Sequence, residues 1–297
     1  MYITDLDIVY ISYDEPKADE LFEQLRMVSP RPPLRVHRVK GFDAAHKRAA
    51  QLARTPHFIT VDGDNVVRPQ FFRWMIASSQ YPSDVVFSYT ALNTVNGLAY
   101  GNGGVKIWPR ELLLSVDTHE RGDGNDFCWT FRYWQMNDLG SDVHFAQSPY
   151  LAFRAGYREA VKLSLVRDQK FDWPTTRAKI YPPNFARLLI WMTVGQDMPH
   201  GAWAIYGARC GMAHLWLDGL DANLIRDYDW FKHRWERFAK DDPVFASVLL
   251  AARLEHALAI DLPNLNPVAS RWFKSVWHNQ PRHGLMAPDM PPPSIVK

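Results

Sequence analysis

Residues 57–65 read His-Phe-Ile-Thr-Val-Asp-Gly-Asp-Asn, an apolar run that ends in two carboxylates. The run Phe58–Val61 is typical of a buried strand, and Asp62 and Asp64 straddle a glycine where this strand is expected to give way to a loop. Such a pair can bind one Mg²⁺ or Mn²⁺, because these ions prefer oxygen ligands and are held by one or two carboxylates together with phosphate oxygens. The same residues also form ordinary turns, so the motif is a hypothesis that its surroundings must support.

Around this motif, the first half of the chain alternates predicted strands and helices. Strands are predicted at Leu6–Tyr13, Leu34–Val39, His57–Val61 and Asp84–Thr90, and helices after Pro16, at Phe42–Ala53 and at Pro69–Ser78. Asn96-Gly97 predicts a tight hairpin turn. Strands that alternate with helices favour an α/β fold with a mixed, mainly parallel sheet and helices on both of its faces.

Beyond residue 104 the pattern is less regular and becomes largely helical. Helices are predicted at Phe153–Val166, Arg226–Lys240 and Asp242–Ile260. We therefore expect a core domain over residues 1–165, a largely helical region over 166–280, and a Pro-rich tail, loosely ordered, over 281–297.

The composition is that of a soluble globular protein, with 47% hydrophobic and 22% charged residues. A net charge of only +2 excludes an overall polycationic, nucleic-acid-coating chain, although residues 151–180 hold seven Lys/Arg against three Asp/Glu. Cys128 and Cys210 are far apart and lack metal-ligand spacing, which favours a reducing compartment. With no signal peptide and no membrane-spanning stretch recognisable, we expect a cytoplasmic protein.

Four features follow one another in order: Tyr-Ile-Ser-Tyr-Asp-Glu at 10–15, Lys-Gly-Phe-Asp-Ala-Ala-His at 40–46, the acidic motif, and Tyr-Gly-Asn-Gly-Gly at 100–104. This order resembles the GT-A nucleotide-sugar glycosyltransferases, whose Rossmann-like domain carries a DxD metal motif, and the resemblance covers roughly residues 5–165. The segments YISYDEP, VKGFDAAH and AYGNGGVKIWPREL are similar to phage-associated transferases that glycosylate hydroxymethylated pyrimidines in DNA.

The resemblance implies roles for the acidic motif and for the first strand. Asp64 would contact the metal directly, and Asp62 the metal or the donor ribose. The residues implied to contact the nucleotide are Ser12, Tyr13, Asp14, Glu15, Lys40 and His46. Alternatives remain, since Asp14 and Glu15 can cap a helix and His46 can be a packing residue.

The resemblance also implies a glycine loop and a catalytic base. Gly103 and Gly104 would let the backbone approach donor sugar and acceptor, or they form a hairpin corner. Asp126, with Asp123 as second choice, would take the acceptor's proton, although this stretch can also be a turn with a helix cap. The family usually has Glu-Asp where this chain has Asn125-Asp126, which leaves the stereochemistry open.

Two further sets of residues complete the predicted site. The family often supplies a histidine as an additional metal ligand, for which His144 is preferred over His200, while a structural role remains the alternative. Arg154 and Arg158, with Lys162, share one helical face that either grips phosphate or is a solvated basic surface.

Together these features predict a glycosyltransferase that depends on Mn²⁺ or Mg²⁺ and uses a nucleotide-diphosphate sugar, with a UDP-sugar as the favoured donor. The predicted acceptor is a 5-hydroxymethylpyrimidine in phage DNA, which places the enzyme in the cytoplasm of an infected bacterium. A saccharide or protein acceptor is one alternative. A non-catalytic DNA-binding protein with a degenerate transferase fold is another.

Overall fold

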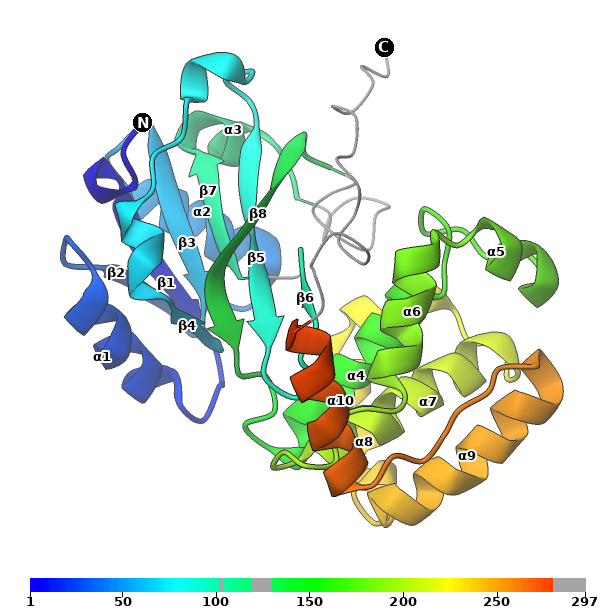
Figure 1. Ribbon diagram of the computed structural model, residues 1–297. Helices are drawn as coiled ribbons and strands as arrows, with labels where there is room; N and C mark the ends of the chain where they lie inside the picture. Colours follow the sequence, from blue (N-terminus) through cyan, green and yellow to red (C-terminus); the bar gives the residue numbers. More distant parts are fainter. Residues whose placement is uncertain (102–103, 119–129, 280–297) are drawn as a thin grey trace. The chain divides into compact units, whose positions relative to one another are not determined.

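The computed structural model describes residues 1–101, 104–118 and 130–279, which form two compact units (Figure 1). Of these residues, the first unit contains 1–94, 99–101, 104–118 and 130–144, and the second contains 95–98 and 145–279. The first unit is built on a sheet and the second on helices.

In the described part of the chain, eight strands form one sheet in the order β2-β1-β3-β7-β5-β8-β4, with β6 paired to β5. The strands are β1 (Asp7–Ser12), β2 (Leu34–His37), β3 (His57–Asp62), β4 (Asn65–Val67), β5 (Val86–Asn93), β6 (Ala99–Tyr100), β7 (Val105–Pro109) and β8 (Tyr133–Val143). β1 runs parallel to β2 and β3, and β5 runs parallel to β8, whereas the remaining pairings are antiparallel.

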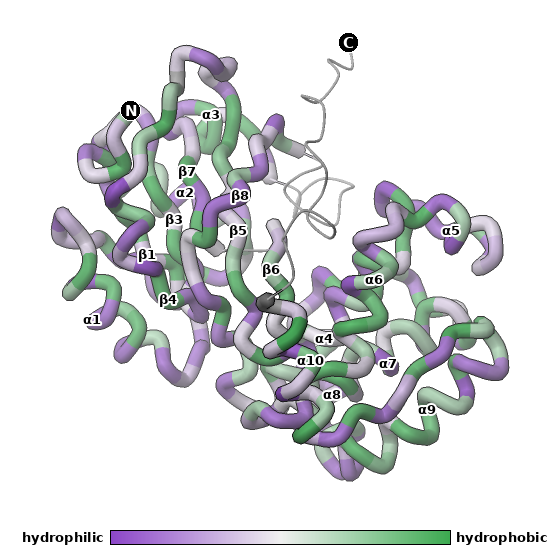
Figure 2. Tube along the Cα trace, viewed as in Figure 1, coloured by the Kyte–Doolittle hydropathy of each residue, from purple (hydrophilic) through white to green (hydrophobic). Residues whose placement is uncertain are grey.

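Helices cover both faces of this sheet. The helices of the first unit are α1 (Ala18–Val28), α2 (Phe42–Leu52) and α3 (Arg110–Ser115), with short 3-10 turns at Ile3–Asp5, Pro69–Arg73 and Ser78–Gln80. One apolar cluster joins α1 and the Pro69–Arg73 turn to Ile8, Ile59 and Ile107. The opposite cluster joins α2 and α3 to Val9, Phe58 and Trp108. In Figure 2, hydrophobic residues alternate with hydrophilic ones along the strands and along α1.

The second unit is helical. Its elements are α4 (Pro149–Leu163), α5 (Trp173–Lys179), α6 (Pro182–Trp191), α7 (Gly201–Trp216), a 3-10 turn (Ala222–Arg226), α8 (Tyr228–Phe238), α9 (Pro243–Leu258) and α10 (Pro267–Asn279). α4 and α7 pack closely at Gly156, where a Cβ would lie only 2.0 Å from the carbonyl oxygen of Ala204. The buried Arg209 of α7 donates to Met192 O, Ser247 O and Asn264 Oδ1, and so ties three segments together. Among the described helices, none is both long and apolar enough to span a membrane.

The predicted α/β fold, with a mixed sheet flanked by helices and a helical C-terminal region, is confirmed. The hairpin at Asn96-Gly97 is also confirmed, since β5 and β6 pair across it and Gly97 has a φ of 76°.

One predicted helix is wrong. Residues Pro69–Ser78 form a 3-10 turn over Pro69–Arg73 and then an extended segment, in which Met75 bridges Tyr2. The buried rings of Phe71 and Phe72 belong to the sheet's core cluster, and this tertiary contact overrides the local helical pattern.

Candidate active site

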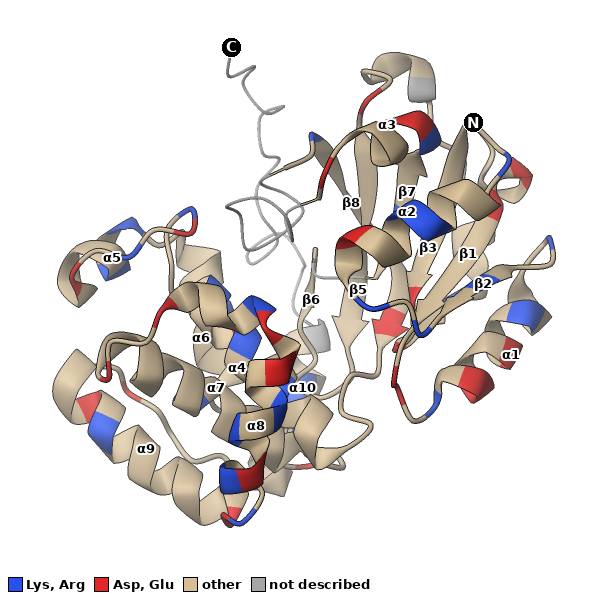
Figure 3. Cartoon of the chain, turned by 180° about the vertical axis from the view of Figure 1, so that it is seen from behind, with Lys and Arg blue, Asp and Glu red and all other residues tan. Residues whose placement is uncertain are grey.

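The acidic motif lies at the carboxyl end of β3, beside the carboxyl end of the parallel strand β1. Asp62 is the last residue of β3 and pairs with Ile11 of β1, and β4 begins at Asn65 directly after the turn. Figure 3 shows acidic residues at this edge of the sheet. Ligands of α/β proteins bind at the carboxyl ends of such strands, so the position is suited to a site.

Gly63 lets the loop after β1 approach the motif. A Cβ on this glycine would lie 2.8 Å from Oε2 of Glu15 and 3.0 Å from Cβ of Ser12. Glu15 is held in place because its Oε2 accepts a 2.7 Å hydrogen bond from the backbone N–H of Tyr13. On the other side, the buried hydroxyl of Tyr10 donates a 2.7 Å hydrogen bond to the carbonyl oxygen of Gly63. The turn is thus fixed between Tyr10 of β1 and Glu15 of the loop that follows β1.

A buried amide orients the second aspartate. Asn65, 2% exposed, donates from Nδ2 to Oδ1 of Asp64 at 2.7 Å. Its Oδ1 accepts hydrogen bonds from the hydroxyl of Ser141 at 2.7 Å and from the N–H of Gly104 at 3.3 Å. Gly104 has no room for a side chain, since a Cβ there would lie 2.5 Å from Cβ of Asp62. Asp64 is therefore held by a network that spans β4, β8 and the glycine loop.

The carboxylates crowd one another. Burial, reinforced by the negative charges of Asp62 and Glu15, raises the pKa of Asp64 from 3.8 to about 7. Burial together with the charges of Glu15 and Asp64 also raises the pKa of the Tyr10 hydroxyl, which stays protonated and keeps donating to Gly63. This concentration of negative charge favours a cation.

The residues present fit an octahedral divalent ion that keeps part of its shell as water or phosphate oxygen. Mg²⁺ is usually held in proteins by one or two carboxylates plus substrate phosphates, and Asp62 and Asp64 supply that number. Within residues 1–101, 104–118 and 130–279, no three His, Cys, Asp or Glu side chains gather in an arrangement that could hold a metal by themselves. A cation held by Asp62 and Asp64 would therefore need further ligands from water or from a bound molecule.

The other residues predicted to contact the nucleotide differ in how far they are buried. The Oγ atom of Ser12 is buried and lies 2.9 Å from Nδ1 of His37 and 3.3 Å from the donating Nε of Arg35. Asp14 and Lys40 are exposed. His46 is 3% exposed, with Nδ1 3.0 Å from the carbonyl oxygen of Phe42 and its ring stacked on Phe42 at 3.7 Å, an environment of packing within α2.

The two candidate histidines lie in different units. His144 follows β8, and its backbone N–H donates a 2.7 Å hydrogen bond to the carbonyl oxygen of Asp64, so the structure brings it beside the motif. Partial burial of the ring lowers the pKa of His144, and the charges that act on it are those of Asp142, Lys17 and Glu20. His200 precedes α7 in the helical unit.

Arg154 and Arg158 are engaged within the helical unit. Both guanidinium groups lie over the ring of Tyr228, at 4.5 and 5.1 Å, and Nε of Arg158 donates to the carbonyl oxygen of Ile225. Lys162 pairs with Glu159 on the same helix. Gly103, Asp123 and Asp126 lie outside the described residues.

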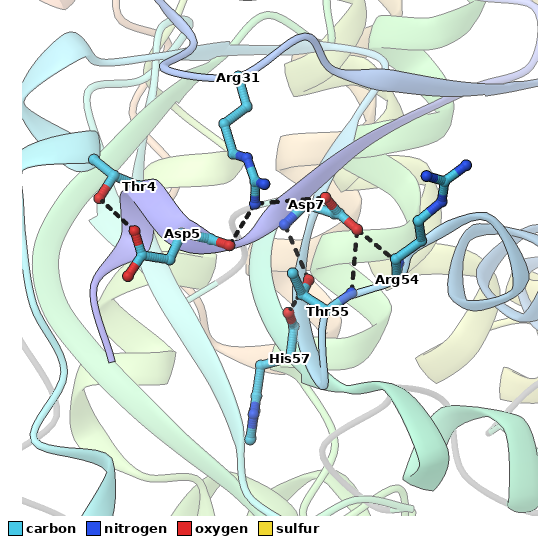
Figure 4. Close-up of polar contacts among 7 residues, drawn as sticks. All are labelled: Thr4, Asp5, Asp7, Arg31, Arg54, Thr55 and His57. Carbon is cyan, nitrogen blue, oxygen red and sulfur yellow. Dashed lines mark hydrogen bonds and ion pairs between the residues drawn. The ribbon is translucent and has the colours of Figure 1, made fainter.

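A second polar cluster lies at the amino ends of β1 and β3 (Figure 4). Asp7 accepts hydrogen bonds from the backbone N–H groups of Arg54 and Thr55, and the Thr55 hydroxyl accepts from the N–H of Asp7. The guanidinium of Arg31 donates to the carbonyl oxygen of Asp5 and lies 3.7 Å from Asp7. These contacts connect the loops at the amino ends of β1 and β3, so we assign this cluster a structural role.

The roles of Tyr10, Asn65 and Ser141 could not be recognised from the sequence alone. Asn65 was visible as part of the motif, but its partner Ser141 is 76 residues away, and only the sheet brings them together. The described residues thus define an α/β protein with an acidic site supported by buried hydrogen bonds.

No protein-family model matches the sequence, and no curated protein matches it. Among solved structures, one similar chain is described as a glycosyltransferase involved in the glycosylation of the major capsid of PBCV-1. This match has 16% sequence identity and a TM-score of 0.28, and it covers 46% of this chain and 93% of that chain.

Proposed function

We propose that the protein is a metal-dependent glycosyltransferase of the GT-A type, which moves a sugar from a nucleoside diphosphate to a hydroxyl group. The observation that carries this proposal is the pair Asp62 and Asp64 at the carboxyl end of β3, with Glu15 of the neighbouring loop close enough for its charge to raise the pKa of Asp64. Two carboxylates at a strand end, in surroundings that raise the pKa of Asp64 to about 7, suit an ion shared with a diphosphate. The order of the sequence motifs supports the same class.

In the proposed reaction, the bond between the sugar's anomeric carbon and the diphosphate oxygen breaks, and its electrons stay on that oxygen. The acceptor oxygen forms the new bond to the anomeric carbon, and its proton passes to a carboxylate, for which we propose Asp126. A bound Mn²⁺ or Mg²⁺ would offset the negative charge that develops on the leaving diphosphate. Asp62 and Asp64 would hold the ion, while Asn65 orients Asp64 and Tyr10 fixes the turn between the two aspartates.

For the acceptor we propose a 5-hydroxymethylpyrimidine base in DNA, on the strength of the sequence resemblance. The target base would leave the helical stack, which requires a few kcal/mol. Arg154 and Arg158 lie over the ring of Tyr228. The two guanidinium groups suit a phosphate backbone, and the exposed ring of Tyr228 suits a base. A UDP-sugar is the proposed donor, and the proposed location is the cytoplasm.

The test is donor turnover. The protein, with Mn²⁺, Mg²⁺ or chelator, is incubated with a panel of sugar nucleotides, and release of nucleoside diphosphate is measured with and without hydroxymethylated single- and double-stranded DNA. We expect release that depends on the ion and is lost in Asp64→Asn, while Glu236→Gln, an exposed change on α8, behaves as wild type. Turnover at full rate in chelator overturns the metal role. Label transfer to a saccharide or protein, with none to DNA, would overturn DNA as the acceptor and support the alternative acceptor class. DNA binding without turnover of any donor would support the alternative of a non-catalytic DNA-binding protein.

A further inference from the structure

One face of the central strands changes from apolar to polar as it approaches the acidic motif. In the apolar part, Phe58 of β3 lies opposite Trp108 of β7, within the cluster under α2 and α3. Two residues further along, on the same face, Thr60 lies opposite Lys106, and Lys106 lies opposite Ser88 of β5. The row Thr60–Lys106–Ser88 therefore replaces the apolar side chains that a closed core would have there.

All three members of this row are buried, at 1%, 7% and 0% exposure for Thr60, Lys106 and Ser88. Lysine is rarely buried to this degree, since removing an ammonium group from water is unfavourable unless a negative group meets it. The buried Oγ atom of Ser88 makes no hydrogen bond with any described residue. The unsatisfied hydroxyl of Ser88, beside Lys106 in the sheet, is a group to which a bound polar ligand would supply a partner.

The row leads directly to the acidic motif. Asp62 lies on the same face two residues beyond Thr60, and its backbone N–H donates to the carbonyl oxygen of Gly104, so the pairing of β3 with β7 continues to this point. Lys106 and Asp62 are thus diagonal neighbours across the two strands, roughly 7 to 8 Å apart at the backbone, a separation that a long side chain can reach across.

We propose that Lys106 is a second cation of the donor site, whose ammonium group binds the terminal phosphate of the nucleoside diphosphate. This inference rests on the proposed function and names a contact of the same site. Asp62, Asp64 and Glu15 place negative charge around the position proposed for the diphosphate, so a positive side chain nearby would favour its binding. As the bond to the sugar breaks, the charge on the departing phosphate grows, and the ammonium stabilises it by a hydrogen bond without losing its proton.

The alternative is a purely structural ion pair between Lys106 and a carboxylate. The two roles differ in what they predict for ligands of different length. A phosphate contact distinguishes a nucleoside diphosphate from a monophosphate, whereas a structural pair supports the fold and leaves that preference unchanged. The experiment therefore compares affinities for UDP, UMP and uridine rather than activity.

Affinities are measured by titration calorimetry in Mn²⁺ for wild type, Lys106→Met, Lys106→Arg and a control, Lys232→Met, at an exposed lysine of α8. We expect Lys106→Met to weaken UDP binding by about 10- to 100-fold, as for loss of a charged hydrogen bond, with uridine unchanged and UMP little affected. Lys106→Arg should retain much of the UDP preference, and the control should equal wild type.

An unchanged ratio of UDP to UMP affinity in folded Lys106→Met overturns the phosphate contact while leaving the proposed function intact. If that variant does not fold, side-chain NMR of ¹⁵N-lysine-labelled wild type, assigned with Lys106→Arg, replaces it. A shift of the Lys106 signal with UDP but not with UMP supports the contact, and equal responses to the two overturn it. If wild type binds no nucleoside diphosphate in Mn²⁺ or Mg²⁺, the proposed function itself is overturned, and the proposed role of Lys106 is overturned with it.

Discussion

Replacing Asp64 by asparagine should make the ligand-free protein more stable at neutral and alkaline pH. The folded-state pKa of Asp64 is raised to about 7 from 3.8, so folding favours its protonated form. The contribution of Asp64 to the free energy of unfolding is fully present below pH 4, falls as the pH rises from about 4 to 7, and is lost above 7. Asparagine removes that dependence and still offers an oxygen to the amide of Asn65.

The magnitude follows from the size of the shift. A change of about three pKa units corresponds to about 4 kcal/mol, which the partial exposure of Asp64 reduces to about 2 to 4 kcal/mol above pH 7. For a unit of this size, that is a rise in Tm of about 5 to 10 °C.

Thermal melts of wild type and Asp64→Asn between pH 5 and 8.5, without metal and then with Mn²⁺ and UDP, measure the effect. The difference in Tm should grow with pH, and the ligands should stabilise wild type much more than the variant, because binding requires the ionised carboxylate. Glu236→Gln serves as the exposed control. A variant that is less stable than wild type at pH 8, or a Tm difference that does not change with pH, would refute the reasoning.

Three further predictions concern the framework. Burial lowers the pKa of His214 to about 4, so between pH 6.5 and 4 the helical unit should lose about 3 kcal/mol of stability as the pH falls, and denaturant titrations of His214→Gln should show a smaller loss over that range. Asp7→Ala removes the acceptor of two backbone N–H groups, and urea melts should show a loss of about 1 to 3 kcal/mol with nucleotide affinity unchanged; altered UDP affinity in the folded variant contradicts a purely structural role. Gly156→Ala places a Cβ 2.0 Å from the backbone of α7, and we expect a loss of more than about 2 kcal/mol, whereas Ala155→Gly on the same helix should lose about 1 kcal/mol or less.

Local sequence patterns were sufficient to predict the elements that hold the acidic motif. The buried run before Asp62 predicted β3, and the apolar spacing of Ala45, Ala49 and Leu52 predicted α2. Strong periodicity and clear breakers act within a few residues, so they can be recognised without knowing the tertiary fold.

The arrangement of those elements could not be predicted in the same way. β7 lies antiparallel between β3 and β5, and β8 returns parallel to β5, because pairing depends on contacts between residues far apart in the chain. Lys106 illustrates the consequence, since a lysine is expected at the surface and only its register opposite Thr60 and Ser88 reveals that it is buried. The same holds for Asn65, whose hydrogen bond to Ser141 joins β4 to β8.

The two ends of the sheet handle carboxylates in opposite ways, and the contrast indicates which end is functional. At the amino end, Asp7 accepts two backbone N–H groups and closes a loop, an arrangement that stabilises the fold without a ligand. At the carboxyl end, burial and the nearby charges of Asp62 and Glu15 raise the pKa of Asp64 and so oppose its ionisation. Selection for stability alone removes such crowding, because a neutral amide at Asp64 relieves it. Neutralising Asp7 should therefore destabilise the protein, and neutralising Asp64 should stabilise it. This opposite response of two aspartates in one sheet is what we expect if Asp7 stabilises the fold and Asp64 has the metal-binding role proposed for it.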